Sequence, residues 1–181
     1  MTEHSRWIAA LLACLLPWLG CSDSGGTSNG RAQELADRLS AALEFQNSST
    51  VDGPPPAEHA DDSSFPQTTG FDVPSVIPYG HNFVLALRTD FVDSSRIAGG
   101  VVHVEHASKH IVIDSPYNSD SGSVNLLGSL IEDPQVAGQS FTIRVGLLDD
   151  KDELGNTLPW VLDTPALDEL EPDAGADAGA E

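Results

Sequence analysis

Alternating apolar and polar residues fill the middle of this chain, from Phe71 to Thr164. Every second residue is apolar from Phe141 to Leu147, and Asn82 to Arg88 repeats the pattern. A period of two residues indicates a β-strand with one buried face. Such runs, separated by Gly, Pro, Asp, Asn and Ser clusters, predict strands at 73–77, 82–88, 100–106, 111–113, 123–131, 141–147 and 157–162. About seven short strands in roughly ninety residues predict an all-β fold, a single antiparallel sandwich over 71–164.

A different period marks residues 31–46, where apolar side chains recur every three to four positions. This spacing predicts an amphipathic helix. Its stripe comprises Ala32, Leu35, Ala36, Leu39, Ala42 and Leu43. A helix of this length is marginal in water by itself. We therefore expect the stripe to dock on the domain, on a partner or on a membrane surface.

Three segments show neither the two-residue period of a strand nor the three-to-four-residue spacing of a helix. Residues 21–30 are rich in Ser and Gly, residues 47–70 in Pro, Ser and Asp, and residues 165–181 in Asp, Ala and Gly. Such compositions bury too little apolar surface to offset the loss of chain entropy. They predict a flexible tether over 21–30, a disordered linker over 47–70 and a disordered acidic tail over 165–181.

At the start of the chain, Arg6 precedes an apolar run that begins at Trp7. A basic residue, a short apolar segment and a small residue predict a secretory signal over residues 1–20. The run is shorter than the ~20 residues that a membrane-spanning helix needs. It ends at Gly20-Cys21.

This junction resembles the lipobox of bacterial lipoproteins. The resemblance implies a signal peptide that is cut before Cys21, with acyl chains such as palmitate attached to the Cys21 thiol. By the same resemblance, Ser22 points to the outer membrane. Two acyl chains suffice for stable membrane anchoring, whereas one does not. The alternative is a plain secreted protein in which Cys21 is incidental.

Charge and cysteine content narrow the possible partners. The 181 residues carry 28 acidic and 8 basic side chains, a net charge of −20. This excess repels nucleic acids and anionic lipid headgroups, and it favours a basic partner or a divalent cation. The two cysteines are Cys14 and Cys21. The predicted domain therefore has no thiol for a disulfide, a thiolate zinc site or a cysteine nucleophile.

Two stretches suggest a family for the sandwich. Gly138-Gln-Ser-Phe-Thr-Ile-Arg-Val145 is followed by acidic residues and then by Gly155-Asn156. Together with Asp93 to Val104, this order resembles strands and loops of bacterial immunoglobulin-like domains. The resemblance implies an immunoglobulin-like sandwich that binds a partner.

Three nearby histidines, His103, His106 and His110, are candidate metal ligands. If Val102 and Ile111 face one core, His106 lies on the core-facing side and the other two lie outside near Glu105. At most two imidazoles and one carboxylate then converge. Ordinary cross-strand pairing on a solvated surface is the alternative.

Acidic loops are the other candidate site. In such a sandwich, the loops after the second, fourth and sixth strands gather at one end. Calcium binds six to eight oxygens in flexible geometry, so these loops predict a calcium site. Its candidate ligands are Asp90, Asp93, Asp149, Asp150 and Asp152, with Asn118, Asp120 and Glu153 nearby. Part of an EF-hand register begins at Asp150, but Leu154 occupies an acidic position, so this is not an EF-hand. A solvated acidic surface is the alternative.

No enzyme motif fits its required context. The string Gly26-Thr-Ser28-Asn-Gly30 matches the G-x-S-x-G of hydrolases, but no predicted strand precedes it. Phosphate loops, HExxH and nucleotide fingerprints do not occur. The sequence therefore predicts a lipid-anchored, non-catalytic module with an adhesive, structural or accessory role. It would bind an envelope protein or glycan and need no cofactor. The alternatives are a calcium-dependent binding module and a secreted enzyme.

Overall fold

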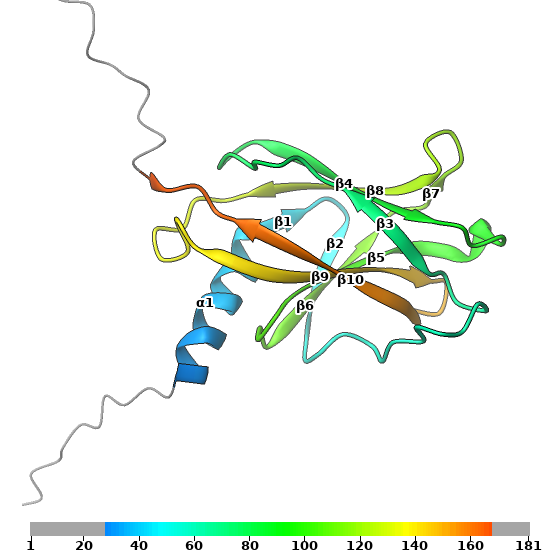
Figure 1. The fold of residues 1–181 in the computed structure, drawn as a ribbon, viewed down its shortest axis with the longest axis horizontal. Coiled ribbons are helices and arrows are strands. Elements are labelled where there is room, and N and C mark those ends of the chain that lie inside the picture. Colours follow the sequence, from blue (N-terminus) through cyan, green and yellow to red (C-terminus); the bar gives the residue numbers. More distant parts are fainter. Residues whose placement is uncertain (1–27, 168–181) are drawn as a thin grey trace, which may run out of the picture.

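Two antiparallel β-sheets pack face to face in the computed structural model, which describes residues 28–167 (Figure 1). The first sheet runs in the order β1 (Leu43–Phe45), β8 (Ser123–Leu130), β4 (Asn82–Thr89) and β3 (Thr68–Asp72), with β7 (Tyr117–Asn118) beside β8. The second runs in the order β10 (Leu154–Asp163), β9 (Ser140–Asp149), β5 (Ile97–Val104), β6 (Lys109–Asp114) and β2 (Ser48–Asp52). The structure is mostly β, so the predicted antiparallel β architecture is confirmed in its two packed sheets.

Alternating residues of both sheets form the core between them. In β4 the buried residues are Phe83, Leu85 and Leu87, and in β9 they include Ile143 and Val145. The rings of Phe83 and Trp160 bring the two sheets into contact, with centroids 6.3 Å apart. Val102 of β5 lies opposite Ile111 of β6, as the parity of the two runs predicted.

The helix α1 (Ser28–Ala42) docks on this core through its apolar stripe. Leu39 is fully buried, and Ala36 and Ala42 are nearly so. Of the three expected docking surfaces, the domain itself is the one that the stripe contacts. The predicted helix end at residue 46 is wrong, because Leu43 to Phe45 pair with β8 as strand β1. Pairing buries Leu43 and Phe45 on the core side and leaves Glu44 in solvent.

The predicted disordered linker over 47–70 is also wrong. Ser48 to Asp52 form strand β2 on β6, and Thr68 to Gly70 begin β3. Between them, residues 53–67 run along the outer side of the second sheet (Figure 1). A side chain supplies hydrogen bonds that hold this segment in place although it forms no strand. Gln67 Nε2 donates to the backbone carbonyl oxygens of His59 and Asp62, each at 3.0 Å.

The edge strand predicted at 73–77 does not form; β3 lies just before it. Pro74 has no backbone N–H to donate to a ladder, whereas Phe71 and Asp72 pair with β4. Ile77 and Tyr79 instead bury their side chains against the core. The described residues contain ten strands rather than seven.

Several predicted features lie outside the described residues: the signal over 1–20, the lipidation site Cys21, residues 21–27 of the tether, and residues 168–181 of the tail. The tether prediction is wrong for residues 28–30, which begin α1. The tail prediction is wrong at its start, because the Pro165 carbonyl oxygen accepts hydrogen bonds from the Tyr79 hydroxyl and the Gly138 N–H, each at 3.1 Å. Within residues 28–167, no helix is long and apolar enough to cross a membrane.

Candidate functional site

Three loops that carry acidic residues lie at one end of the sandwich, opposite α1 (Figure 1). They are the β4–β5 loop with the 3₁₀ turn η1 (Ser94–Arg96), the turn after β7, and the β9–β10 turn. We call these three loops the acidic end. As expected for this architecture, alternate connections of the sheets meet there.

Asp149 organises the β9–β10 turn from inside the protein. Its side chain has no exposed surface. One carboxylate oxygen accepts hydrogen bonds from the N–H groups of Lys151, at 2.8 Å, and Glu153, at 3.0 Å. The other accepts one from Arg96 Nη2 at 2.8 Å. Burial by itself raises the pKa of Asp149, but the N–H groups of Glu153 and Lys151 and the Arg96 guanidinium outweigh it, so the pKa lies below its usual value.

Arg96 ties three separate segments to this buried carboxylate. Besides Asp149, it donates from Nη1 to the Ser64 carbonyl oxygen at 3.1 Å. Its guanidinium carbon lies 5.6 Å from the centre of the Phe91 ring, within cation–π range. The β4–β5 loop, the β9–β10 turn and the 53–67 segment are thereby held together.

Four other acidic side chains of this end are exposed to solvent, those of Asp90, Asp93, Asp150 and Asp152. Between the first two, Val92 is 98% exposed. The acidic end therefore combines a fixed framework with an exposed negative surface and one apolar side chain at its tip.

The predicted calcium ligands do not form a coordination set. No group of three or more His, Cys, Asp or Glu side chains in residues 28–167 is placed to hold a metal ion. Both oxygens of Asp149 are already engaged by protein donors. Asp93 accepts a hydrogen bond from the Ser95 hydroxyl at 2.6 Å. These contacts give the two carboxylates structural roles within their loops.

The three histidines separate in a way that the sequence did not predict. His106 is exposed in the β5–β6 turn, with a positive φ of 72°, rather than facing the core. His110 is only 5% exposed rather than outside, because strand β2 pairs alongside it and Gly53 carries the chain over it. Its Nδ1 lies 3.0 Å from the Gly53 carbonyl oxygen.

His103 is half-buried on the outer face of the second sheet. Its Nδ1 lies 3.1 Å from the Lys109 carbonyl oxygen. Burial lowers the pKa of His103, which that hydrogen bond only partly opposes. The rings of His103 and His110 thus each contact a different backbone carbonyl oxygen, and His106 lies exposed in the turn.

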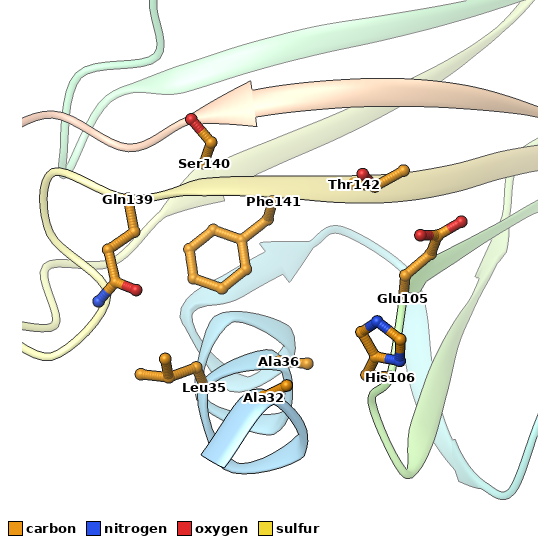
Figure 2. A pocket seen from close by; sticks show the side chains of 9 residues that line it. All are labelled: Ala32, Leu35, Ala36, Glu105, His106, Gln139, Ser140, Phe141 and Thr142. Carbon is orange, nitrogen blue, oxygen red and sulfur yellow. The ribbon is translucent and has the colours of Figure 1, made fainter. Parts of the chain in front are cut away.

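A shallow cavity of about 290 Å³ lies at the α1 end of the domain (Figure 2). Leu35 of the helix and Phe141 of β9 line it, and Glu105 and His106 close one side. Ser28 and Gly30 of the G-x-S-x-G string belong to the first turn of α1, and the residues before Ser28 lie outside the described part of the chain.

Two residues that hold this architecture were missed as such from the sequence. Asn156 binds the backbone of β3 like a paired strand: its Oδ1 accepts the Thr68 N–H at 2.6 Å and its Nδ2 donates to the Thr68 carbonyl oxygen at 3.1 Å. Arg96 is the second. The one available signal was Gly155-Asn156 itself, since glycine before a polar amide indicates close backbone contact.

No known protein family, curated protein or solved structure matches this chain.

Proposed function

We propose that this chain is a lipid-anchored protein of the cell envelope, attached to the outer membrane through Cys21, whose β-domain binds a partner without catalysis. The apolar run that ends at Gly20-Cys21 supports the anchor. Two acyl chains would hold the protein on the membrane stably.

The observation that carries the proposal is that α1 and the acidic end lie at opposite ends of the domain. The chain enters the fold at Ser28, at the α1 end, and the acidic end lies on the opposite side (Figure 1). An anchor at Cys21 is seven residues from Ser28, which permits a separation of at most about 25 Å. Because residues 47–70 belong to the fold, this short tether alone would set the reach. The anchored domain would then present its acidic end away from the bilayer.

The chemistry of the acidic end favours a basic protein segment as partner. Asp90, Asp93, Asp150 and Asp152 supply the negative charge, and Val92 supplies an exposed apolar contact. The Arg96–Asp149 contact fixes the loops before binding, so little conformational entropy is lost when a partner docks. Charge complementarity of this kind raises association rates and selects partners.

We include an immunoglobulin-like topology in this proposal. In such sandwiches, strands A, B and E pair in one sheet and C, F and G in the other. The neighbours β3-β4-β8 and β5-β9-β10 follow that pairing. Strands β1 and β2 would then be additions from the N-terminal side, at the outer edges of the two sheets.

Site-specific photo-crosslinking in cells that produce the full chain tests the binding role. A photoreactive residue at Val92 should capture one partner, and the same residue at Val161, 63% exposed on β10, should not. Capture should fall at high salt and in the Asp150→Asn, Asp152→Asn double variant.

The matched control is Glu34→Gln, Glu132→Gln, which removes as much charge from exposed positions elsewhere. Equal capture from Val92 and Val161, or equal loss in both double variants, would overturn the assignment to the acidic end.

A further inference from the structure

Strand β2 is the outermost strand of the second sheet, and one side of it is open. It pairs with β6, and no other segment of residues 28–167 pairs with it. All five of its residues are exposed. An open strand edge is a template for pairing with another chain.

The register shows which backbone groups are available. Just outside β2, the Asp114 N–H donates to the Asn47 carbonyl oxygen at 2.9 Å, and the Gly53 N–H donates to the Ser108 carbonyl oxygen at 2.8 Å. Hydrogen-bonded positions alternate along an antiparallel pair. Ser49 and Val51 therefore bond to β6, while the N–H and C=O groups of Ser48, Thr50 and Asp52 point outward.

The opposite edge of the second sheet is protected, which makes β2 distinctive. In β10, Pro159 has no N–H, and the Glu58 carboxylate accepts from the Thr157 N–H at 3.2 Å and its hydroxyl at 2.6 Å. β2 contains no proline, lysine or bulge. These are the devices that usually prevent edge-to-edge pairing.

The first sheet offers no comparable edge. β1 is only three residues long. The pairing of β3 with β4 is irregular between Thr68 and Gly70. The Asn156 side chain already hydrogen-bonds to the N–H and C=O groups of Thr68.

We propose that β2 pairs with β2 of a second copy of this chain, antiparallel, about a two-fold axis at Thr50. Thr50 then lies opposite its equivalent, and Ser48 lies opposite Asp52 of the other copy. About six backbone hydrogen bonds form. The second sheets of the two copies join into one continuous sheet. The two acidic ends then point in opposite directions, so this dimer is an alternative to the bilayer-anchored orientation proposed above and not part of it.

Self-complementarity favours a second copy as the occupant. In this register each Asp52 carboxylate faces a serine hydroxyl, with Lys109 Nζ of its own chain 3.6 Å away. Moving the two-fold axis to Asp52 would oppose two carboxylates and lose most of the hydrogen bonds. Threonine pairs and serine–carboxylate pairs across strands are favourable, whereas like charges directly opposite are not.

The net charge of −20 on each chain opposes this association at long range. At physiological ionic strength, salt screens repulsion between charges that are more than about 8 Å apart. Pairing through backbone hydrogen bonds is therefore expected to strengthen as salt increases. A contact made by the acidic end with a basic partner has the opposite salt dependence.

Disulfide trapping in the full chain tests the register. Residues 28–167 contain no cysteine, so Thr50→Cys introduces the one thiol of the described domain. Across the two-fold axis the Cα atoms would be about 5.5 Å apart, within the range of a disulfide. For Val51→Cys, the matched control, equivalent positions are diagonal and about 7–8 Å apart. Oxidation should give a covalent dimer with Thr50→Cys and little with Val51→Cys, relative to the unsubstituted chain.

Sedimentation of the purified chain supplies the second readout. Thr50→Pro removes an outward N–H and leaves the β6 ladder intact, and Thr50→Lys places two ammonium groups opposite each other. Both should be monomers at concentrations where the parent chain dimerises, with dissociation constants raised more than tenfold. Both should keep the thermal midpoint that the parent chain has at concentrations where it is monomeric.

Any of three results with the purified chain would overturn the proposal: a parent chain that is monomeric at every concentration and salt, a Thr50→Lys variant that sediments as the parent does, or equal trapping by both cysteine variants. A disulfide between Thr50→Cys and a different protein would mean that β2 pairs with a strand of that protein, which would also overturn the proposal.

Discussion

Replacing Asp149 with asparagine tests how the acidic end is held. The substitution keeps the size of the side chain, and one oxygen can still accept from the N–H groups of Lys151 and Glu153. The new amide group then faces Arg96 Nη2, which now approaches at 2.8 Å, so two donors confront each other. The change therefore removes the charge and turns the acceptor that faces Arg96 into a donor.

The magnitude follows from burial. Breaking a fully buried ion pair costs about 3–5 kcal/mol. Arg96 is 31% exposed and can be partly hydrated, so we expect a loss of about 2–4 kcal/mol in the free energy of unfolding. For about 140 folded residues, the unfolding entropy converts this loss into a fall of roughly 10 °C in Tm.

The loss should depend on pH. The folded protein holds the pKa of Asp149 below its unfolded value, so the carboxylate stabilises the fold above about pH 4. This contribution disappears as the pH falls through the folded-state pKa. The difference in stability between the parent chain and Asp149→Asn should therefore be largest at neutral pH and shrink below about pH 4.

Urea unfolding monitored by tryptophan fluorescence measures this difference, because Trp160 is buried in the core and is the one tryptophan after the predicted signal. Asp150→Asn is the control: that side chain is 56% exposed and lies 3.8 Å from Arg96 Nε. It should change stability by less than about 0.5 kcal/mol. Equal effects of the two substitutions, or a cost for Asp149→Asn that does not vary with pH, would refute the reasoning.

Gly155→Ala should lower the free energy of unfolding by about 1–3 kcal/mol, because the added Cβ would collide with the Pro66 carbonyl oxygen. Gly70→Ala is the control: its Cβ would meet only the flexible Arg88 side chain, so the loss should be much smaller. The midpoints of urea unfolding compare the two variants. Millimolar calcium should leave the Tm unchanged, and a rise that Asp150→Ala, Asp152→Ala abolishes would contradict the geometry. Native proteolysis should spare residues 53–67, since hydrogen bonds anchor this segment to Leu154, Gly155 and Arg96; rapid cleavage there would count against its ordered path.

The strands whose side chains alternate between core and solvent could be predicted from the sequence. β4 follows the period-two pattern, because one face packs on the opposite sheet. β9 follows it only in its first half, since Val145 to Asp149 are all buried. β2 could not be found in this way, since all five of its residues are exposed and its pattern carries no hydrophobic signal. Its place in the fold depends on the register with β6, which local composition does not encode.

The candidate site was predicted in position but not in role. The loops that carry Asp90 and Asp150 do lie at one end, as the topology implied. Which carboxylate is buried depends on Arg96, whose partner Asp149 is 53 residues away. The burial of His110 likewise depends on Gly53, 57 residues away. Contacts over such separations are invisible to periodicity and spacing.

The most direct test of the central claim is the mass of the first residue of the mature protein. We predict that protein purified from membranes of the producing cells begins at Cys21, and that its N-terminal peptide is heavier by the mass of attached acyl chains. A mature chain that begins at another residue, or an unmodified Cys21, would contradict the account.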